Sequence, residues 1–338
     1  MYIEYFRSSS FNTHEMCPHS YFLEYNLGLP TLSNMAADKG TIVHKVLEIL
    51  ALIKKAKQEK KTRIKHEICG NIQTDKYKLD IIIEQIYKYY STHITHHTWT
   101  NDHFQECRKW VYKAIEYNDG QFNPLNRIVI DAEPFFDIEI AEPWAMYKYA
   151  IKDNLVKKFL SIKGTVDLVT QIGNGVYEII DWKSGKYRKN WATGEDKNYE
   201  DFKKDPQLRI YHYAAHRMYK MDQVLVTVFY INAGGPYTVC FEKKDLKDTE
   251  EMLRIKFEEI KQDIKPKLNK SWKCTKFCHF GLNTFEGTHV NPKVDNSRYM
   301  TQCEQVEFDL FHQGMDCVIK KYTMPEYQIG NYRDPGSI

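Results

Sequence analysis

Apolar positions along the chain follow two different periods. From Thr41 to about Lys60 they recur at helical spacing, at 42, 43, 46, 47, 49, 50 and 53, which predicts an amphipathic helix after a threonine start. Residues 126–141 and 163–186 alternate between apolar and polar positions, as strands do, and glycines at the centre of 163–186 predict a hairpin. Further elements are predicted as a helix opened by Asp205 as N-cap with Pro206 at its first position, a buried strand over 223–232 and an amphipathic helix within 241–264. Strands placed between helices in this order indicate a mixed α/β core.

The remaining hydrophobic pattern indicates how the chain is organised into a core and insertions. Residues 78–117 predict further helix, interrupted near 91–102, and the region 55–125 looks like a helical insertion. The region from Trp272 onward is irregular and bears cysteines. Because the 338 residues contain no repeat and no Gly/Ser linker, we expect one body over 1–338 with insertions.

Composition narrows the class of protein. Hydrophobic residues make up 42% and charged residues 28%, which is typical of a soluble globular protein. A net charge of +3 neither requires nor excludes a nucleic-acid partner. With no apolar run near membrane length and no secretory signal, we expect no membrane contact and a cytoplasmic location, in the host cytoplasm if a phage encodes the chain. The eight cysteines are then expected to be thiols or metal ligands.

The predicted hairpin carries two aspartates and a lysine. A three-residue turn at 173–175 would pair positions whose numbers sum to 348, so Asp167 would lie opposite Asp181. Like charges at directly opposed positions are destabilising, and Lys183 shares the sheet face of Asp181 by the period of two. A divalent cation such as Mg²⁺ or Mn²⁺ would complete such a site. An ordinary solvated Asp–Lys salt bridge remains the alternative for this pattern on its own.

Four ordered motifs give this hairpin a context: "GTIVH" (40–44), "GTVD" (164–167), "DWKSG" (181–185) and "QLRIY" (207–211). Together they resemble the PD-(D/E)XK nuclease superfamily, in particular its RecB-like branch. The resemblance implies a restriction-endonuclease-like fold, a mixed central sheet flanked by helices. It also implies a Mg²⁺ or Mn²⁺ site and a set of catalytic residues. The metal ligands would be His44, Asp167 and Asp181. Asp167 and Asp181 would also belong to the catalytic set, together with Lys183, Gln207 and Tyr211.

Each of the less specific residues has an ordinary interpretation as well. His44 could be a satisfied residue of an amphipathic helix. Gln207 and Tyr211 lie at i and i+4 on one helical face; as a pair they would orient Lys183 or grip a DNA phosphate. Glu133, in "DAEPFF", falls where many relatives have a glutamate, and a strand-edge charge is the alternative.

The cysteines form a second pattern. "CPHSYFLEY" begins at Cys17, and "CTKFC" spans Cys274 to Cys278. This combination resembles the iron-sulfur subset of RecB-like nucleases, AddB-type and CRISPR-associated relatives, which implies a [4Fe-4S] cluster on Cys17, Cys274, Cys278 and Cys303. The region 270–320 would then pack against the N-terminus. The spacings depart from the family, so Cys317 and His279 compete for the fourth position, and a structural Zn²⁺ is the alternative. Cys69, Cys107 and Cys240 are expected to be separate buried thiols.

The sequence also indicates a DNA substrate. "KSGKYRKNW" (183–191) extends from Lys183 with basic residues between aromatic ones, which suit phosphates and unpaired bases. The resemblance implies a metal-dependent DNA exonuclease for single strands or DNA ends, in replication, repair or phage recombination, with water attack giving a 5′-phosphate. Without a nucleotide-binding G-x₄-G-K-[ST] motif the chain should not hydrolyse ATP, which leaves room for a separate helicase or recombinase partner. A catalytically reduced DNA-binding or assembly subunit and a structure- or site-specific endonuclease remain as alternatives.

Overall fold

The computed structural model describes residues 1, 3–151, 154–185, 189, 194–263, 266–282, 284–289 and 299–324. The chain divides into two compact units. One contains residues 33–136 and 164–249, and the other contains residues 1–32, 137–163 and 250–338. One boundary lies between Leu32 and Ser33, and the other three fall within β5 (Phe135–Glu139), β8 (Ser161–Thr165) and α8 (Asp245–Gln262).

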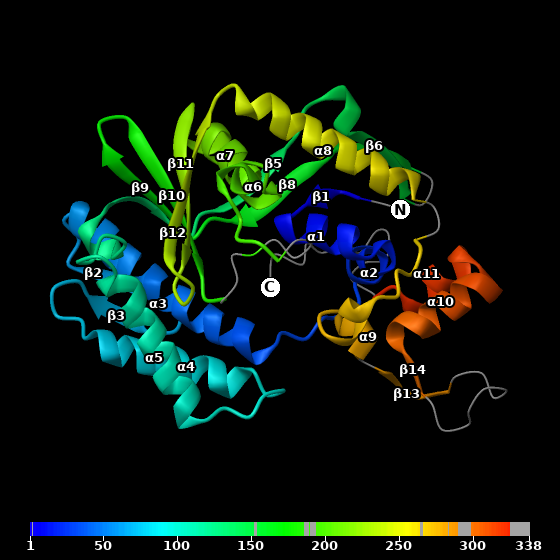
Figure 1. Ribbon diagram of the computed structural model, residues 1–338, viewed down its shortest axis with the longest axis horizontal. Coiled ribbons are helices and arrows are strands. Elements are labelled where there is room, and N and C mark those ends of the chain that lie inside the picture. The colour runs from blue at the N-terminus through cyan, green and yellow to red at the C-terminus, as the bar shows by residue number, and fades with distance from the viewer. Residues whose placement is uncertain are drawn as a thin grey trace. The chain divides into compact units, whose positions relative to one another are not determined.

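The unit formed by residues 33–136 and 164–249 is built on a five-stranded sheet (Figure 1). Its order is β12 (Gly235–Glu242), β11 (Gln223–Tyr230), β10 (Val176–Lys183), β9 (Leu168–Gly173) and β4 (Ile128–Ala132). β10 and β11 are parallel, and the other pairs are antiparallel. The connection between the parallel strands contains α6 (Tyr199–Lys203) and α7 (Pro206–Tyr219). The mixed sheet flanked by helices is the fold class expected from the sequence.

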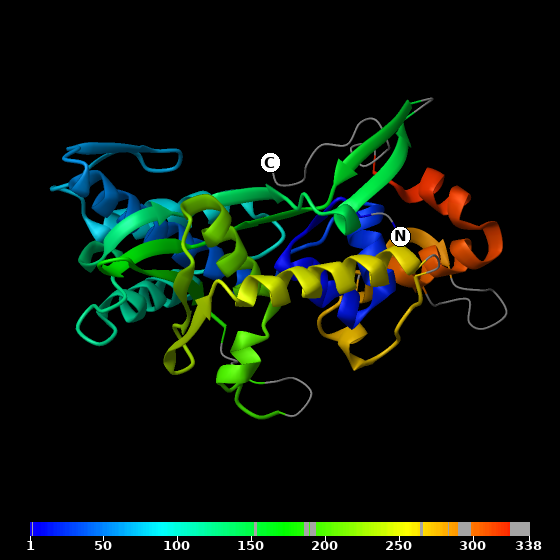
Figure 2. The same ribbon diagram turned by 90° about the horizontal axis from the view of Figure 1, so that it is seen from above.

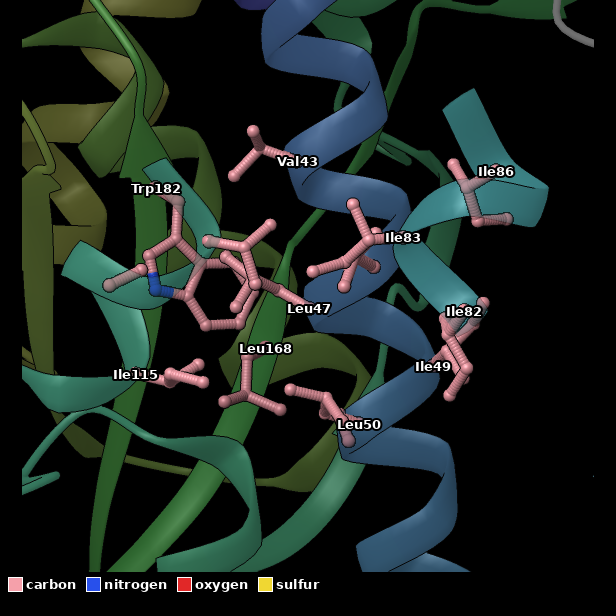
Figure 3. Packing of buried hydrophobic residues seen from close by; sticks show 14 of the residues in the cluster. Val43, Leu47, Ile49, Leu50, Ile82, Ile83, Ile86, Ile115, Leu168 and Trp182 are labelled. Atoms are coloured by element: carbon pink, nitrogen blue, oxygen red, sulfur yellow. The ribbon is translucent and has the colours of Figure 1, made fainter. Parts of the chain in front are cut away.

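Helices cover both faces of this sheet (Figures 1 and 2). On one face, α3 (Met35–Gln58) packs with α4 (Leu79–His93), α5 (Asn101–Glu116) and the 3₁₀ turn η2 (Pro124–Asn126). Figure 3 shows Leu47, Leu168 and Trp182 meeting in this core, and all three are almost completely buried. α7 lies against the other face. β10 is therefore buried on both sides, which is typical of a strand in a parallel pair.

The other unit combines short strands and helices. A three-stranded sheet has the order β1 (Tyr5–Phe6), β8, β5, and two hairpins are formed by β6 (Met146–Ile151) with β7 (Asn154–Phe159) and by β13 (Thr284–His289) with β14 (Tyr299–Thr301). The helical elements are α1 (Ser8–Met16), α2 (Pro18–Tyr21), the π-helix η1 (Phe22–Asn26), the 3₁₀ turns η3 (Pro143–Ala145) and η4 (Trp272–Thr275), α8, α9 (His279–Leu282), α10 (Gln302–Gln313) and α11 (Met315–Tyr322).

Several elements differ from the sequence-based expectation. The first long helix begins at Met35, because Asn34 caps it by accepting from Ala37 N–H at 3.0 Å, and Thr41 lies inside the helix. The region 55–125 contains a β-hairpin, β2 (Arg63–His66) with β3 (Gly70–Gln73), besides its helices. The strand expected over 126–141 is broken into β4 and β5 at Glu133, whose φ is +49°, and Pro134.

The C-terminal region is more regular than the sequence indicated. α10 starts at a capping box: Thr301 Oγ1 accepts from Glu304 N–H, and Glu304 Oε2 accepts from Thr301 N–H, both at 3.2 Å. This is the S/T-x-x-E signature of a helix start, which is readable in the sequence at 301–304. In the part of the chain that the structure describes, no helix combines the length and apolarity of a membrane span.

Candidate active site

The centre of the candidate site is the end of β10. Asp181 and Lys183 share one face of this strand, and the Lys183 Nζ to Asp181 Oδ2 distance is 2.7 Å. β11 pairs with the strand through Lys183, which fixes its backbone there, whereas pairing with β9 ends at Ile180. Trp182, which lies between Asp181 and Lys183, points to the opposite face and into the α3 core. The alternation of a strand thus places the polar pair and its hydrophobic anchor on opposite sides.

The second aspartate reaches this point from the start of β9. The predicted register is confirmed, since four pairs between β9 and β10 sum to 348. The turn itself is the two residues Asn174 and Gly175, followed by a bulge. Asp167 precedes the first paired residue, so it does not face Asp181 across the ladder as predicted. Instead its Oδ2 accepts from Trp182 N–H at 2.7 Å, because the ladder has ended and leaves that N–H available.

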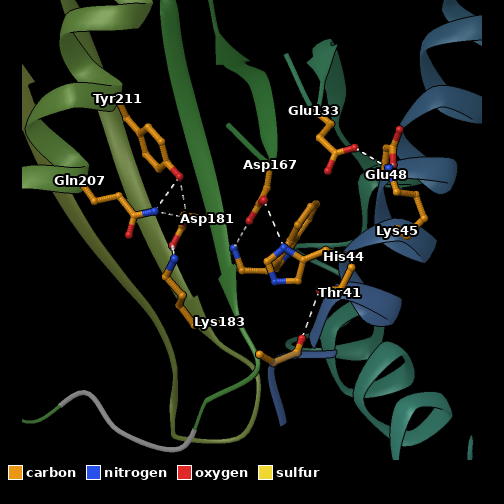
Figure 4. Close-up of polar contacts among 12 residues, drawn as sticks. Thr41, His44, Lys45, Glu48, Glu133, Asp167, Asp181, Lys183, Gln207 and Tyr211 are labelled. Carbon is orange, nitrogen blue, oxygen red and sulfur yellow. Dashed lines mark hydrogen bonds and ion pairs between the residues drawn. The ribbon is translucent and has the colours of Figure 1, made fainter. Parts of the chain in front are cut away.

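The third element is α3. His44 Nδ1 lies 3.2 Å from Asp167 Oδ1, and Figure 4 shows the two side chains facing each other. α3 approaches the end of β10 closely, since a Cβ on Gly40 would lie 2.5 Å from Ser184 Oγ. A glycine one turn before His44 therefore lets the helix carry the imidazole to the strand ends.

Charge and burial act in opposite directions on the two carboxylates. Burial by itself would raise the pKa of Asp167, but His44, Lys183 and the Trp182 N–H outweigh it and the pKa is lowered. The pKa of Asp181 is raised, because burial and the charge of Asp167 outweigh Lys183. Burial would lower the pKa of Lys183, but the two carboxylates raise it, so the amine is held as an ammonium. A further cation would ease the ionisation of Asp181.

α7 supplies two hydrogen bonds to the same carboxylate. As predicted, Asp205 is the N-cap, accepting from Gln207 N–H at 3.0 Å, and Pro206 is the first residue. Tyr211 OH donates to Asp181 Oδ1 at 3.1 Å, and Gln207 Nε2 lies 3.3 Å from the same oxygen and 2.7 Å from Tyr211 OH. In this arrangement the pair holds Asp181, whereas the sequence suggested Lys183 or a phosphate as its target.

A second group of charges borders the site. Glu133 accepts from Lys45 Nζ at 2.9 Å, and Lys45 Nζ is 2.6 Å from Glu48 Oε2 (Figure 4). Burial and the neighbouring Glu133 raise the pKa of Glu48 to about 7. Sequence reasoning missed Lys45 and Glu48, although both follow His44 on the helix at positions i+1 and i+4, so that Glu48 lies on its face.

An open depression of about 300 Å³ lies beside these groups. It is lined by residues of α3, including His44, by Glu133, and by the end of β10 with the residues that follow it, including Lys183 and Ser184. Of the basic segment 183–191, residues 186–188, 190 and 191 lie outside the described residues. Lys189 is described; it is exposed and forms an isolated bridge with Asp196. The contact of this segment with DNA therefore stays a prediction.

The cysteines meet at a different place, in the other unit. Cys17 lies between α1 and α2, Cys274 in η4, Cys278 before α9 and Cys303 in α10, and all four line one cavity of about 280 Å³. Burial and the three other sulfurs raise the pKa of the Cys303 thiol.

Backbone groups around this cavity face the sulfurs. Asn269 N–H lies 3.4 Å from Cys17 Sγ, and Ser271 N–H lies 3.4 Å from Cys274 Sγ. The two competitors for the fourth position, Cys317 and His279, are not among the cavity's lining residues. Cys317 Sγ instead lies 3.0 Å from Gln313 Oε1.

The remaining cysteines differ in burial. Cys107 is fully buried in the α3 core, as expected, whereas Cys69 and Cys240 are only partly buried.

A mixed sheet flanked by helices, with two acids and a lysine at adjoining strand ends, defines a restriction-endonuclease-like α/β protein. Residues 8–281 match the family model of the PD-(D/E)XK nuclease superfamily, and the chain belongs to this superfamily. The match agrees with the resemblance drawn from the four motifs.

Two solved structures are similar to the chain. One is a protein of Eubacterium rectale called "Putative exonuclease", with 12% identity, a TM-score of 0.47 and coverage of 80% of this chain and 86% of that chain. The other is SSO0001, with 17% identity, a TM-score of 0.23 and coverage of 44% and 57%. No curated protein matches the sequence.

Proposed function

We propose that this chain is a metal-dependent DNA exonuclease that hydrolyses phosphodiester bonds in single strands or at DNA ends. The observation that carries the proposal is the convergence, beside an open depression, of His44 from α3, Asp167 from the position before β9, and Asp181 and Lys183 from β10. Two carboxylates and an imidazole, which must give up its ligating proton on binding, are a donor set that suits Mn²⁺ or Mg²⁺. A cation held there supplies phosphate binding and a water of lowered pKa.

The side chains of the site have separate roles in this proposal. Asp167 and Asp181 provide negative charge, and His44 adds a nitrogen ligand. Lys183, held as an ammonium by the two carboxylates, positions the attacking water and neutralises charge that develops on the phosphate. Gln207 and Tyr211 are positioning residues, because they contact Asp181 and fix its orientation. Attack by water with loss of the 3′-oxygen leaves a 5′-phosphate.

A labelled linear single strand, incubated with Mn²⁺, tests this proposal. Nucleotide release should be lost in Asp181→Ala and in Lys183→Ala. Asp131→Asn is a matched control, because Asp131 also has a lysine and a tyrosine beside it, Lys55 Nζ at 2.8 Å and Tyr219 OH at 3.0 Å, but lies in β4 away from the site. Cleavage that persists in both site variants would contradict the assignment of the site. DNA binding without cleavage by the parent protein would favour a DNA-binding subunit. Cuts in circular single-stranded DNA would instead indicate an endonuclease.

We also propose that Cys17, Cys274, Cys278 and Cys303 hold a [4Fe-4S] cluster with a structural role. Four thiolates are the ligands such a cluster requires, and N–H groups facing the sulfurs suit its negative charge. Among the described residues no three of these sulfurs lie within 4.8 Å of one another. Around a single zinc ion they would be about 3.8 Å apart. A single zinc ion would therefore require the sulfurs to move closer together.

Anaerobic purification distinguishes the two groups. Brown protein containing iron and sulfide supports the cluster, and colourless protein with stoichiometric zinc contradicts it. Cys317→Ser is a matched control that should leave the iron content unchanged, whereas Cys303→Ser should lower it.

A further inference from the structure

Two histidines of the loop between α4 and α5 meet a buried aspartate of α3. His97 Nε2 lies 2.9 Å from Asp38 Oδ2, and His96 Nε2 lies 3.8 Å from the same oxygen. One ligand atom of each of the three residues lies within 4.8 Å of the others, and this is the one such group of histidine, cysteine and carboxylate side chains among the described residues. The group lies entirely within one unit of the chain and involves none of the residues assigned above to catalysis.

The buried position of Asp38 is unusual for a carboxylate unless a charged group faces it. Asp38 is 4% exposed, and burying an ionised carboxylate is costly without compensation. Although Asp38 Oδ2 and His97 Nε2 are close, both atoms are buried and neither has a well-aligned hydrogen bond within the described structure. Both atoms are therefore available to bind an ion that lies between them. The His96 and His97 rings, with centroids 4.2 Å apart, complete the group.

We propose that Asp38, His96 and His97 form a second metal site, separate from the nuclease site, that binds Zn²⁺. Two imidazole nitrogens and one carboxylate oxygen, with a further position for water, are a set typical of zinc. Ligand atoms about 2.0–2.1 Å from a tetrahedral zinc would be about 3.3 Å apart, and the observed 2.9 and 3.8 Å lie on either side of that value. Mg²⁺ prefers oxygen ligands and fits this site less well.

Zinc binding requires a small change at His96. His96 Nε2 lies 3.1 Å from the Ser33 carbonyl oxygen, and this contact must be given up because a metal-bound imidazole nitrogen carries no proton. The side chain is 32% exposed, so it can turn at low cost.

A zinc ion at this site would link the α4–α5 loop to the start of α3. Asp38 lies in the first turns of the helix that continues through Gly40, Thr41 and His44, which line the depression of the candidate active site. Zinc would hold the loop against this wall of the depression.

Zinc titration of chelator-treated protein tests the site, with binding followed by isothermal calorimetry and the thermal midpoint of unfolding followed in parallel. Since the cysteines could also take zinc, all proteins carry Cys303→Ser and are compared with one another. His96→Asn and His97→Asn should each weaken this binding event at least tenfold and remove the zinc-dependent rise in midpoint. His93→Asn is the matched control, because His93 ends α4 just before this loop but contacts the Tyr89 carbonyl oxygen instead of Asp38. The His93→Asn protein should bind zinc as the parent does.

The outcomes separate a metal site from an ion pair. Equal zinc binding and equal midpoints in the parent and all three variants would overturn the proposal and leave Asp38 and His97 as an ion pair. If His97→Asn unfolds without metal, the exposed His96→Asn still decides the question, since its side chain adds little to the packing. Asp167→Ala should retain the zinc effect, which keeps this test independent of the nuclease assignment.

Discussion

Replacing Tyr211 with phenylalanine tests how the site holds Asp181, the carboxylate whose pKa is raised. The hydroxyl donates to Asp181 Oδ1 at 3.1 Å and accepts from Gln207 at 2.7 Å. Its removal leaves Oδ1 with the longer contact to Gln207, at 3.3 Å. The pKa of Asp181 is already raised by burial and by Asp167, and the loss of a donor to the ionised form raises it further.

The magnitude follows from the charge of the acceptor. A hydrogen bond to a charged group contributes about 1.5–3 kcal/mol. Loss of a partner that orients a metal ligand typically lowers metal affinity by about 10–100-fold, which corresponds to about 1.4–2.8 kcal/mol. The two ranges agree. We therefore expect Tyr211→Phe to raise the Mn²⁺ concentration for half-maximal cleavage by about 10–100-fold, with a much smaller effect at saturating Mn²⁺.

The assay is a Mn²⁺ titration of strand digestion, with direct Mn²⁺ binding measured on the DNA-free protein. Tyr219→Phe is the matched control, because Tyr219 is also on α7 and its hydroxyl donates to a carboxylate, Asp131, at 3.0 Å outside the site. The control should leave the half-maximal concentration unchanged. A folded Tyr211→Phe protein whose Mn²⁺ requirement stays within twofold of the parent would refute the role given to this hydroxyl.

Three further predictions concern stability and the cysteine cavity. Burial lowers the pKa of His212 to about 4 from 6.5, so between these values the unfolded chain binds a proton that the folded chain does not. The free energy of unfolding should fall by about 2 kcal/mol from pH 7 to pH 5 through this residue, and His212→Phe, which can keep the stacking on Phe241, should flatten that slope in urea titrations. Gly281→Ala should cost about 1–3 kcal/mol and reduce bound iron, because its Cβ would lie 2.5 Å from the Cys274 carbonyl oxygen; unchanged iron content would argue against this packing. Leu47→Ala, in the fully buried core, should cost about 2–5 kcal/mol in guanidinium unfolding, and a loss below 1 kcal/mol would contradict the burial.

Local rules accounted for the parts of the fold that depend on neighbouring residues. The register of the β9–β10 hairpin could be read from its alternation and its glycine-rich centre, because both are set within about twenty residues. The turn itself was predicted with three residues and has two, and the bulge after it restores the predicted register. The start of α7 at Asp205 and Pro206 likewise follows from capping at one helix end. The start of α3 was misplaced because the cap at Asn34 lies eight residues before Ile42, where the apolar period becomes visible.

The sequence by itself determined the hairpin register, the shared face of Asp181 and Lys183, and the order of the four motifs, because periodicity, turn chemistry and short motifs are properties of the chain. The tertiary structure decided that Asp167 turns onto the Trp182 N–H, that Gln207 and Tyr211 hold Asp181, and that Cys303 shares a cavity with Cys17. It also brought Asp38 to His96 and His97. These contacts join residues 15 to 286 positions apart, and no local period encodes such distances. They follow from the way the helices and strands pack, which depends on the whole core at once.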